Sequence, residues 1–135
     1  MRKRLLPLVV LTFLALFGCS SNEAGIDDLL TNAKIDDVLN KAKKEGKIVM
    51  LELGSVGCIP CEQMKPVMEK MRTNYKGNLE VLFIDVWKYH ENARRFGVTV
   101  IPTQVFLDKN GKEFHRHIGF YPYEEIVPIL KKTGL

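Results

Sequence analysis

The sequence predicts an α/β domain whose central mixed β-sheet has helices on both faces. Short apolar runs of strand length alternate with segments in which apolar residues recur at helical spacing. Two consecutive strands are separated by three residues that end in glycine, which is typical of an antiparallel hairpin. The length of 135 residues and the hydrophobic content of 46% fit one globular domain. Helices on both sides of a sheet accommodate this order of elements.

The first half of the domain alternates helix and strand. Between residues 26 and 45 the apolar side chains recur at helical spacing, and Gly46 favours the end of that helix. Residues 47–53 and 79–85 are apolar runs of strand length. Between them, residues 61–75 carry an apolar helical face that includes three methionines. We interpret these methionines as core rather than as a metal-binding stripe.

The second half contains the hairpin and two more helices. Residues 90–96 are predicted to form a short helix. Residues 103–108 and 112–118 are predicted strands joined across Lys109-Asn110-Gly111. A last helix is predicted over residues 123–132, and Pro128 is expected to disturb it.

The N-terminus carries an export signal. Basic residues at positions 2–4 precede an apolar run over residues 5–17, which is shorter than the about 20 residues of a membrane span. We therefore predict a signal peptide over residues 1–18. The stretch L-F-G-C resembles a bacterial lipoprotein signal, so residues 19–30 are predicted to be a lipid anchor on Cys19 and a polar tether. The alternatives are an ordinary cleaved signal or an uncleaved anchor, with Cys19 incidental.

The charge of the chain does not favour nucleic-acid binding. The net charge is +4, but Arg2, Lys3 and Arg4 supply three of the positive charges. Without them, the 20 Lys and Arg become 17, against 16 Asp and Glu, which leaves a net charge of +1. A phosphate binder needs a concentrated basic surface. We therefore expect no nucleic-acid partner.

Cys58 and Cys61 are the two cysteines that remain when Cys19 is assigned to the anchor. Export places them in an oxidising compartment, where a disulfide can persist. A structural zinc site would need four ligands, often as two close pairs. His115 and His117 share a face of a predicted strand, but such a pair is more typical of the polar face of an edge strand. Nothing in the spacing ties them to Cys58, and we expect no metal.

Redox chemistry fits the pair better. Pro60 lies between the cysteines, and proline is well tolerated in the first turn of a helix. Cys58 should therefore lie at a helix N-terminus, with Cys61 one turn further and about 5–6 Å away, close enough to form a disulfide. Unpaired N–H groups and the positive end of the helix favour a thiolate at Cys58. C-x-x-C at a strand-to-helix junction of an exported domain thus indicates a pair that opens and closes.

Further motifs follow the cysteines in a specific order. Pro66 lies five residues beyond the second cysteine. A strand ending in F-I-D is followed, after a short helix, by R-F-G-V-T-V-I-P-T, and then by the hairpin D-K-N-G-K and Gly119. With C-I-P-C between a strand and a helix, these motifs resemble those of the thioredoxin family, from about residue 33 to the end of the chain. The resemblance implies a thioredoxin-like fold over residues 31–135 and thiol–disulfide exchange.

The resemblance also implies roles for single residues. A cis peptide is expected at Ile101–Pro102, packed against the cysteine pair, where the backbone pairs with an extended substrate. Glu52 holds the place of a buried aspartate of the family and is expected to exchange a proton with the second thiol. The alternative for Glu52 is a strand-end carboxylate in solvent. The residues expected to contact substrate are Gly57, Ile59, Pro60, Ile101, Pro102, Thr103, Gly119 and Phe120.

The sequence departs from thioredoxins in three places. Gly57 stands where thioredoxins usually carry a tryptophan, and Val81 where some members carry a lysine near the buried acid. A clear first strand is missing before residue 30. Phe120 and Tyr121 are candidates for a replacement apolar platform, or simply for core residues.

The predicted function is that of an exported thiol–disulfide oxidoreductase that reduces protein disulfides through Cys58 and Cys61, with Glu52 as proton acceptor. No dissociable cofactor is expected, and electrons come from a membrane reductase or another thiol protein. We expect a monomer in the cell envelope, held at the membrane by lipid on Cys19 and facing the periplasm or the extracytoplasmic side. Two alternatives remain: a copper-handling module with both thiols and a histidine as ligands, and a binding domain with a permanent disulfide.

Overall fold

The structure is a computed structural model that describes residues 32–135. The predicted signal peptide over residues 1–18 lies outside the described residues, as do the predicted anchor and tether over residues 19–30 with Cys19. Among the described helices, none is both long and apolar enough to cross a membrane.

The described residues form a four-stranded mixed sheet in the order β2-β1-β3-β4. Strand β1 (Ile48–Gly54) pairs in parallel with β2 (Leu79–Asp85) and antiparallel with β3 (Thr103–Leu107). Strand β4 (Glu113–Ile118) pairs antiparallel with β3 and forms one edge. The predicted α/β fold with a mixed sheet is confirmed, and the predicted strand over residues 79–85 has the observed bounds.

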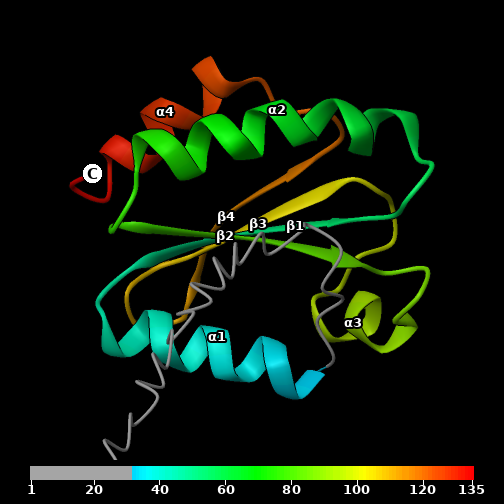
Figure 1. Cartoon of the computed structure of the whole chain (residues 1–135), viewed down its shortest axis with the longest axis horizontal. Helices are drawn as coiled ribbons and strands as arrows, with labels where there is room; N and C mark the ends of the chain where they lie inside the picture. Colours follow the sequence, from blue (N-terminus) through cyan, green and yellow to red (C-terminus); the bar gives the residue numbers. More distant parts are fainter. Residues whose placement is uncertain (1–31) are drawn as a thin grey trace, which may run out of the picture.

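Helices cover both faces of the sheet, as predicted (Figure 1). Helices α2 (Ile59–Asn74) and α4 (Tyr123–Lys131) lie on one face, and α1 (Asn32–Lys44) and α3 (His90–Arg95) on the other. Each face of the sheet therefore has its own apolar core. The core under α2 and α4 includes Met50 and Met64, and the core under α1 includes Ile35 and Leu51.

Strand β1 is buried along its whole length because it is a central strand covered on both faces. Its side chains alternate, so Ile48 and Met50 enter the core under α2, whereas Val49 and Leu51 enter the core under α1. Glu52 is next on the α2 side. A carboxyl group is therefore placed on a largely apolar face of the strand, close to the end that leads into the cysteine loop.

Two helices differ from the sequence prediction. Helix α2 begins at Ile59 rather than at Cys61, because Pro60 occupies its second position, where a missing N–H costs no helical hydrogen bond. Pro128 was expected to disturb the last helix, but α4 continues through it to Lys131. Pro128 lies on the exposed side of α4, and the buried Ile126 and Leu130 anchor the helix on either side of it.

Candidate active site

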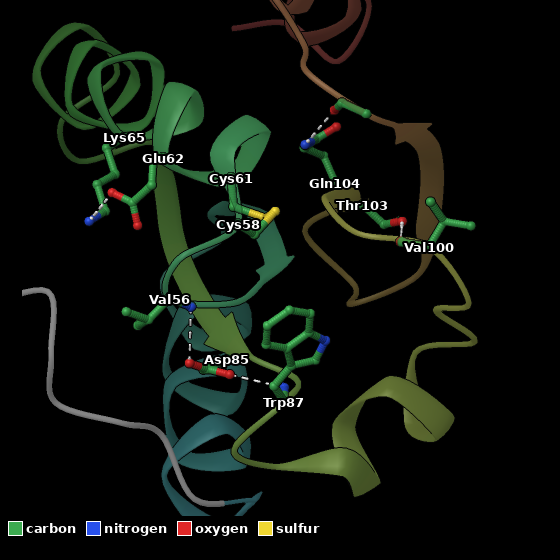
Figure 2. The surroundings of a disulfide bond; sticks show 11 residues. Val56, Cys58, Cys61, Glu62, Lys65, Asp85, Trp87, Val100, Thr103 and Gln104 are labelled. Carbon is green, nitrogen blue, oxygen red and sulfur yellow. Dashed lines mark hydrogen bonds and ion pairs between the residues drawn. A yellow bond between two sulfur atoms is a disulfide. The ribbon is translucent and has the colours of Figure 1, made fainter.

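Cys58 and Cys61 form a disulfide at the N-terminus of α2, with their Cα atoms 5.2 Å apart (Figure 2). Cys58 is the N-cap residue of the helix, and its carbonyl accepts a hydrogen bond from the Glu62 N–H at 3.0 Å. The predicted place of Cys58 at a helix N-terminus is therefore confirmed. The first-turn N–H groups that remain unpaired by helical geometry are available to stabilise a thiolate at this position.

The two cysteines differ in exposure. Cys58 is half-buried, whereas Cys61 is only 2% exposed and belongs to the core. Gly54, at the end of β1, allows Cys61 to lie this deep, because a Cβ added to Gly54 would stand 3.0 Å from the Cys61 Sγ and 3.3 Å from the Phe83 ring. Any larger residue at position 54 would push the inner sulfur atom outward. The exposure of the pair thus assigns the accessible thiol to Cys58 and the protected thiol to Cys61.

Gly57 fixes the shape of the loop that presents Cys58. Its φ of +83° lies in the left-handed region, which side chains with a Cβ adopt at a cost of about 1–2 kcal/mol. The tryptophan that thioredoxins usually carry at this place would therefore be strained in this loop. Position 57 therefore contributes no apolar side chain to the surface around Cys58.

Glu52 is fully buried on the α2 side of β1, and its predicted burial is confirmed. Burial raises the pKa of its carboxyl from 4.5 to about 8, and the neighbouring Gln104 side chain opposes this rise. Neither carboxyl oxygen of Glu52 makes a hydrogen bond within residues 32–135. At neutral pH the carboxyl is mostly protonated, and its pKa is close to that of a thiol.

The segment that precedes β3 carries the predicted cis peptide, at Ile101–Pro102. Pro102 is buried, and its carbonyl accepts a hydrogen bond from the Gly119 N–H at 2.8 Å. Thr103 is only 2% exposed, and its hydroxyl donates to the Val100 carbonyl at 2.6 Å. Ile101 and Gly119 were also predicted to contact substrate, and both are partly accessible to solvent.

Asp85 joins the cysteine loop to the loop that follows β2. One carboxyl oxygen accepts a hydrogen bond from the Val56 N–H at 3.3 Å, and the other accepts from the N–H groups of Trp87 and Lys88, both at 2.9 Å. Asp85 can reach both loops because Gly54 and Asp85 pair at the ends of two parallel strands. Figure 2 shows the Trp87 ring extending from its loop toward the cysteine loop.

Exposed apolar side chains occur on the loops of the cysteine end of the sheet. Phe120, one of the two candidates for the apolar platform, is 43% exposed, whereas the other, Tyr121, is 4% exposed and belongs to the core. The predicted contact residue Ile59 is 75% exposed at the start of α2. Val56, Trp87 and Val100 are the other exposed large apolar residues of these loops.

The histidines of β4 pack against Tyr121. His115 Nε2 lies 3.0 Å from the Tyr121 hydroxyl, and the His117 ring stacks on the Tyr121 ring with centroids 3.9 Å apart. Both histidines of the edge strand thus contact Tyr121, which follows that strand. Among the described residues, no group of three or more His, Cys, Asp or Glu side chains is arranged to hold a metal ion.

Residues 35–134 match the profile of the thioredoxin-like domain family. The chain belongs to this family. A thioredoxin from Staphylococcus aureus is 28% identical over 99 residues, which are 73% of this chain and 94% of that protein. The cysteine pair of this thioredoxin-like protein, at the helix start described above, is of the redox type. The protein is therefore a thiol–disulfide oxidoreductase.

Solved thioredoxin structures show the same fold as this thioredoxin-like protein. A thioredoxin from Nicotiana alata superposes with a TM-score of 0.66 at 29% identity, covering 75% of this chain and 86% of that one. A thioredoxin h from poplar superposes with a TM-score of 0.68 at 27% identity, covering 76% and 90%. The resemblance inferred from the motifs is confirmed at the level of family and fold.

Four residues of the site were not identified in the sequence: Gly54, Asp85, Trp87 and Gln104. Asp85 was visible as the last residue of a predicted strand, and the rule that parallel strands end at one edge would have placed it beside the cysteine loop. Gln104 was visible as a polar residue within an apolar strand. Its position opposite Glu52 depends on strand register, which the sequence does not reveal.

Proposed function

We propose that this thioredoxin-like protein is an exported reductant of protein disulfides. The Cys58 thiolate attacks one sulfur of a substrate disulfide, which forms a mixed disulfide and releases the other substrate sulfur as a thiolate. Cys61 then loses its proton and attacks the Cys58 sulfur, and the second substrate thiolate leaves. Two electrons pass from the cysteine pair to the substrate, and a thiol protein or a membrane reductase restores them.

The observation that supports this order of attack best is the difference in exposure between the two thiols. An incoming protein disulfide can approach Cys58 at the N-cap of α2, whereas Cys61 is protected beneath it. Glu52, on the same side of the sheet, has a pKa near that of a thiol, so it is suited to accept the Cys61 proton in the resolving step. Pro60 removes one possible N–H donor to the Cys58 thiolate, which favours moderate rather than strong stabilisation and therefore a reducing couple.

A trapping experiment tests the assignment of the thiols. The Cys61→Ser variant should accumulate mixed disulfides with envelope proteins, because the resolving thiol is missing. The Cys58→Ser variant, which retains one thiol, is the matched control and should accumulate few. Equal trapping by both variants, or trapping by Cys58→Ser alone, would contradict the mechanism.

The proposal includes export and anchoring through Cys19. The short apolar run that ends at Gly18-Cys19 supports lipidation of Cys19 and attachment to the membrane of the cell envelope. Metabolic labelling with a radioactive fatty acid should mark the wild-type chain and leave the Cys19→Ala variant unmarked. Label that persists in the variant would show that the anchor has been misassigned.

A further inference from the structure

Three polar side chains form a row across the sheet beneath α2. Glu52 of β1 pairs in register with Gln104 of β3, and Gln104 pairs with His117 of β4. Side chains in register across a sheet lie on the same face. Glu52 and Gln104 are both completely buried, whereas His117 lies on the edge strand and is half-buried. The row therefore runs from the carboxyl of Glu52 to the surface at β4.

At the buried end of this row, several oxygen atoms that can accept a hydrogen bond have no donor. Both carboxyl oxygens of Glu52 and the Oε1 of Gln104 have no hydrogen-bond partner among the described residues. Unpaired buried oxygens are unfavourable. A proton on Glu52 converts one of these acceptors into a donor, and Gln104 Oε1 is the neighbouring acceptor. An ionised Glu52 would instead attract the amide N–H groups of Gln104.

The nitrogen of the Gln104 amide is bound to the loop that follows β4. Gln104 Nε2 donates to the Gly119 carbonyl at 3.1 Å, and the Gly119 N–H donates to the Pro102 carbonyl at 2.8 Å (Figure 2 draws the first bond). Phe120, the next residue, is exposed. A single buried amide thus lies opposite Glu52 in the sheet and is bonded to Gly119, which in turn is bonded to Pro102.

We propose that Gln104 is a positioning residue for thiol–disulfide exchange: it sets the proton affinity of Glu52 and couples the charge of Glu52 to the Gly119–Phe120 loop. The inference rests on the proposed function for its catalytic meaning, but the coupling itself is a property of the oxidised protein. When the N–H of Gln104 turns to Glu52, it would favour the ionised carboxyl. When the Oε1 of Gln104 turns to Glu52, it would favour the protonated carboxyl. Either rotation would alter the hydrogen bond from Gln104 Nε2 to the Gly119 carbonyl.

The surroundings of Glu52 leave Gln104 as its nearest adjustable partner. Burial raises the pKa of Glu52, and the Gln104 side chain opposes this rise. On this side of the sheet β2 and α4 contribute apolar side chains, and α2 contributes Cys61, which is held in the disulfide in the oxidised protein. The residues concerned are Val81 and Phe83 of β2, Ile126 and Leu130 of α4, and, towards β4, Tyr121 with His115 and His117.

Nuclear magnetic resonance of the oxidised full-length protein tests the coupling directly. In wild type, the Glu52 carboxyl carbon and the Gly119 and Phe120 amides should titrate together. In Gln104→Leu, which removes the amide, the Glu52 pKa should rise by about one unit, a tenfold change in proton affinity, because the Gln104 side chain no longer opposes the effect of burial. The Gly119 and Phe120 amides should no longer follow it.

Two variants serve as controls. Gln63→Leu makes the same change at an exposed position of α2 and should leave the Glu52 titration unchanged. Glu52→Gln retains both histidines of β4, so it gives the baseline against which the loop response is measured. An unchanged Glu52 pKa in Gln104→Leu, or a loop that still follows Glu52, would overturn the proposal.

The catalytic part has its own measurement. A mixed disulfide between Cys58 and thionitrobenzoate releases its colour when Cys61 attacks, and the pH profile of that release should move upward in Gln104→Leu together with the Glu52 pKa. In the Glu52→Gln background, Gln104→Leu should have no further effect on the profile. If the Glu52 pKa shifts in Gln104→Leu but the pH profile of thionitrobenzoate release stays as in wild type, the positioning role would be overturned. If the protein reduced no protein disulfide, the proposed function would fail, but the titration would still decide the coupling.

Discussion

The two sulfur atoms of the disulfide lie in different surroundings, although they are bonded to each other. Cys58 is half-buried at the N-cap of α2, where unpaired N–H groups and the helix dipole lower a thiol pKa. Cys61 is 2% exposed and lies against Gly54, where desolvation raises a thiol pKa. One turn of helix thus separates a partly exposed sulfur atom from a buried one.

Limiting alkylation of the reduced protein should modify Cys58 first. The thiolate is the reactive form, a helix N-terminus favours it, and Cys58 at the N-cap is also the more exposed of the two cysteines. Iodoacetamide below one equivalent, followed by peptide mapping, measures the ratio, which we expect to exceed roughly tenfold. Preferential labelling of Cys61 would reverse the two roles.

Glu52 should make the protein less stable as the pH rises. Its pKa is 4.5 in the unfolded chain and about 8 in the oxidised fold, so between these values the folded state binds more protons than the unfolded state. The free energy of unfolding should therefore fall from about pH 4.5 to about pH 8 and then level off. The full difference corresponds to about 5 kcal/mol, at about 1.4 kcal/mol per unit.

The Glu52→Gln variant isolates this contribution because it keeps the shape and removes the charge. Guanidinium unfolding of both oxidised proteins at several pH values between 4.5 and 9 gives the difference in stability. The free energy of unfolding of the variant should increase steadily relative to that of wild type up to about pH 8. A difference that stays constant over this range would mean that Glu52 does not bind its proton as the buried site implies.

At the scale of elements, the site lies where β1, β2 and α2 meet. The two parallel strands end together at Gly54 and Asp85, and Asp85 holds the loop before α2 against the loop that carries Trp87. This arrangement supplies an aromatic ring near the disulfide by way of a different element from the one that usually carries it in thioredoxins. The positive φ at Gly57 disfavours a tryptophan at that position.

Trp87 should report the state of the disulfide. It is the only tryptophan of the chain, and a disulfide close to an indole ring quenches its fluorescence. Reduction should therefore increase the emission of wild type. In Asp85→Ala three N–H donors lose their acceptor, so the two loops should separate and the increase should become smaller. The Cys58→Ser/Cys61→Ser double variant is the control and should show no response to reductant; an unaltered increase in Asp85→Ala would contradict the bridging role.

Much of the element pattern was predictable because it depends on local signals. Apolar runs gave the four strands to within two residues, and Gly46 and Pro60 marked a helix end and a helix start. The cysteine pair was recognisable because its members are neighbours in the sequence. Gln104 was not recognisable, because its proposed role depends on the strand register that places it opposite Glu52. The two residues are 52 positions apart in the sequence. Pro128 was misjudged because packing of α4 outweighs one missing N–H.

At the scale of the whole molecule, the thioredoxin-like fold places one redox pair at the end of a rigid sheet. The sheet places Glu52 and Gln104 opposite each other on two neighbouring strands, and the loops at the cysteine end present exposed apolar side chains. The fold is shared with thioredoxins, but the direction of electron flow depends on how strongly the Cys58 thiolate is stabilised. The proposed reducing character of the couple therefore depends on one equilibrium, that between the dithiol and the disulfide forms of Cys58 and Cys61.

The reduction potential of the Cys58–Cys61 couple measures that equilibrium. The full-length protein is equilibrated in dithiothreitol buffers of graded ratio, and the free thiols at Cys58 and Cys61 are counted by alkylation and mass spectrometry. We predict a value well below about −150 mV, in the range of roughly −270 to −200 mV found for thioredoxins and glutaredoxins. A value near about −120 mV would make the protein an oxidant, and one below about −300 mV would indicate a permanent structural disulfide; either result would contradict the proposed function.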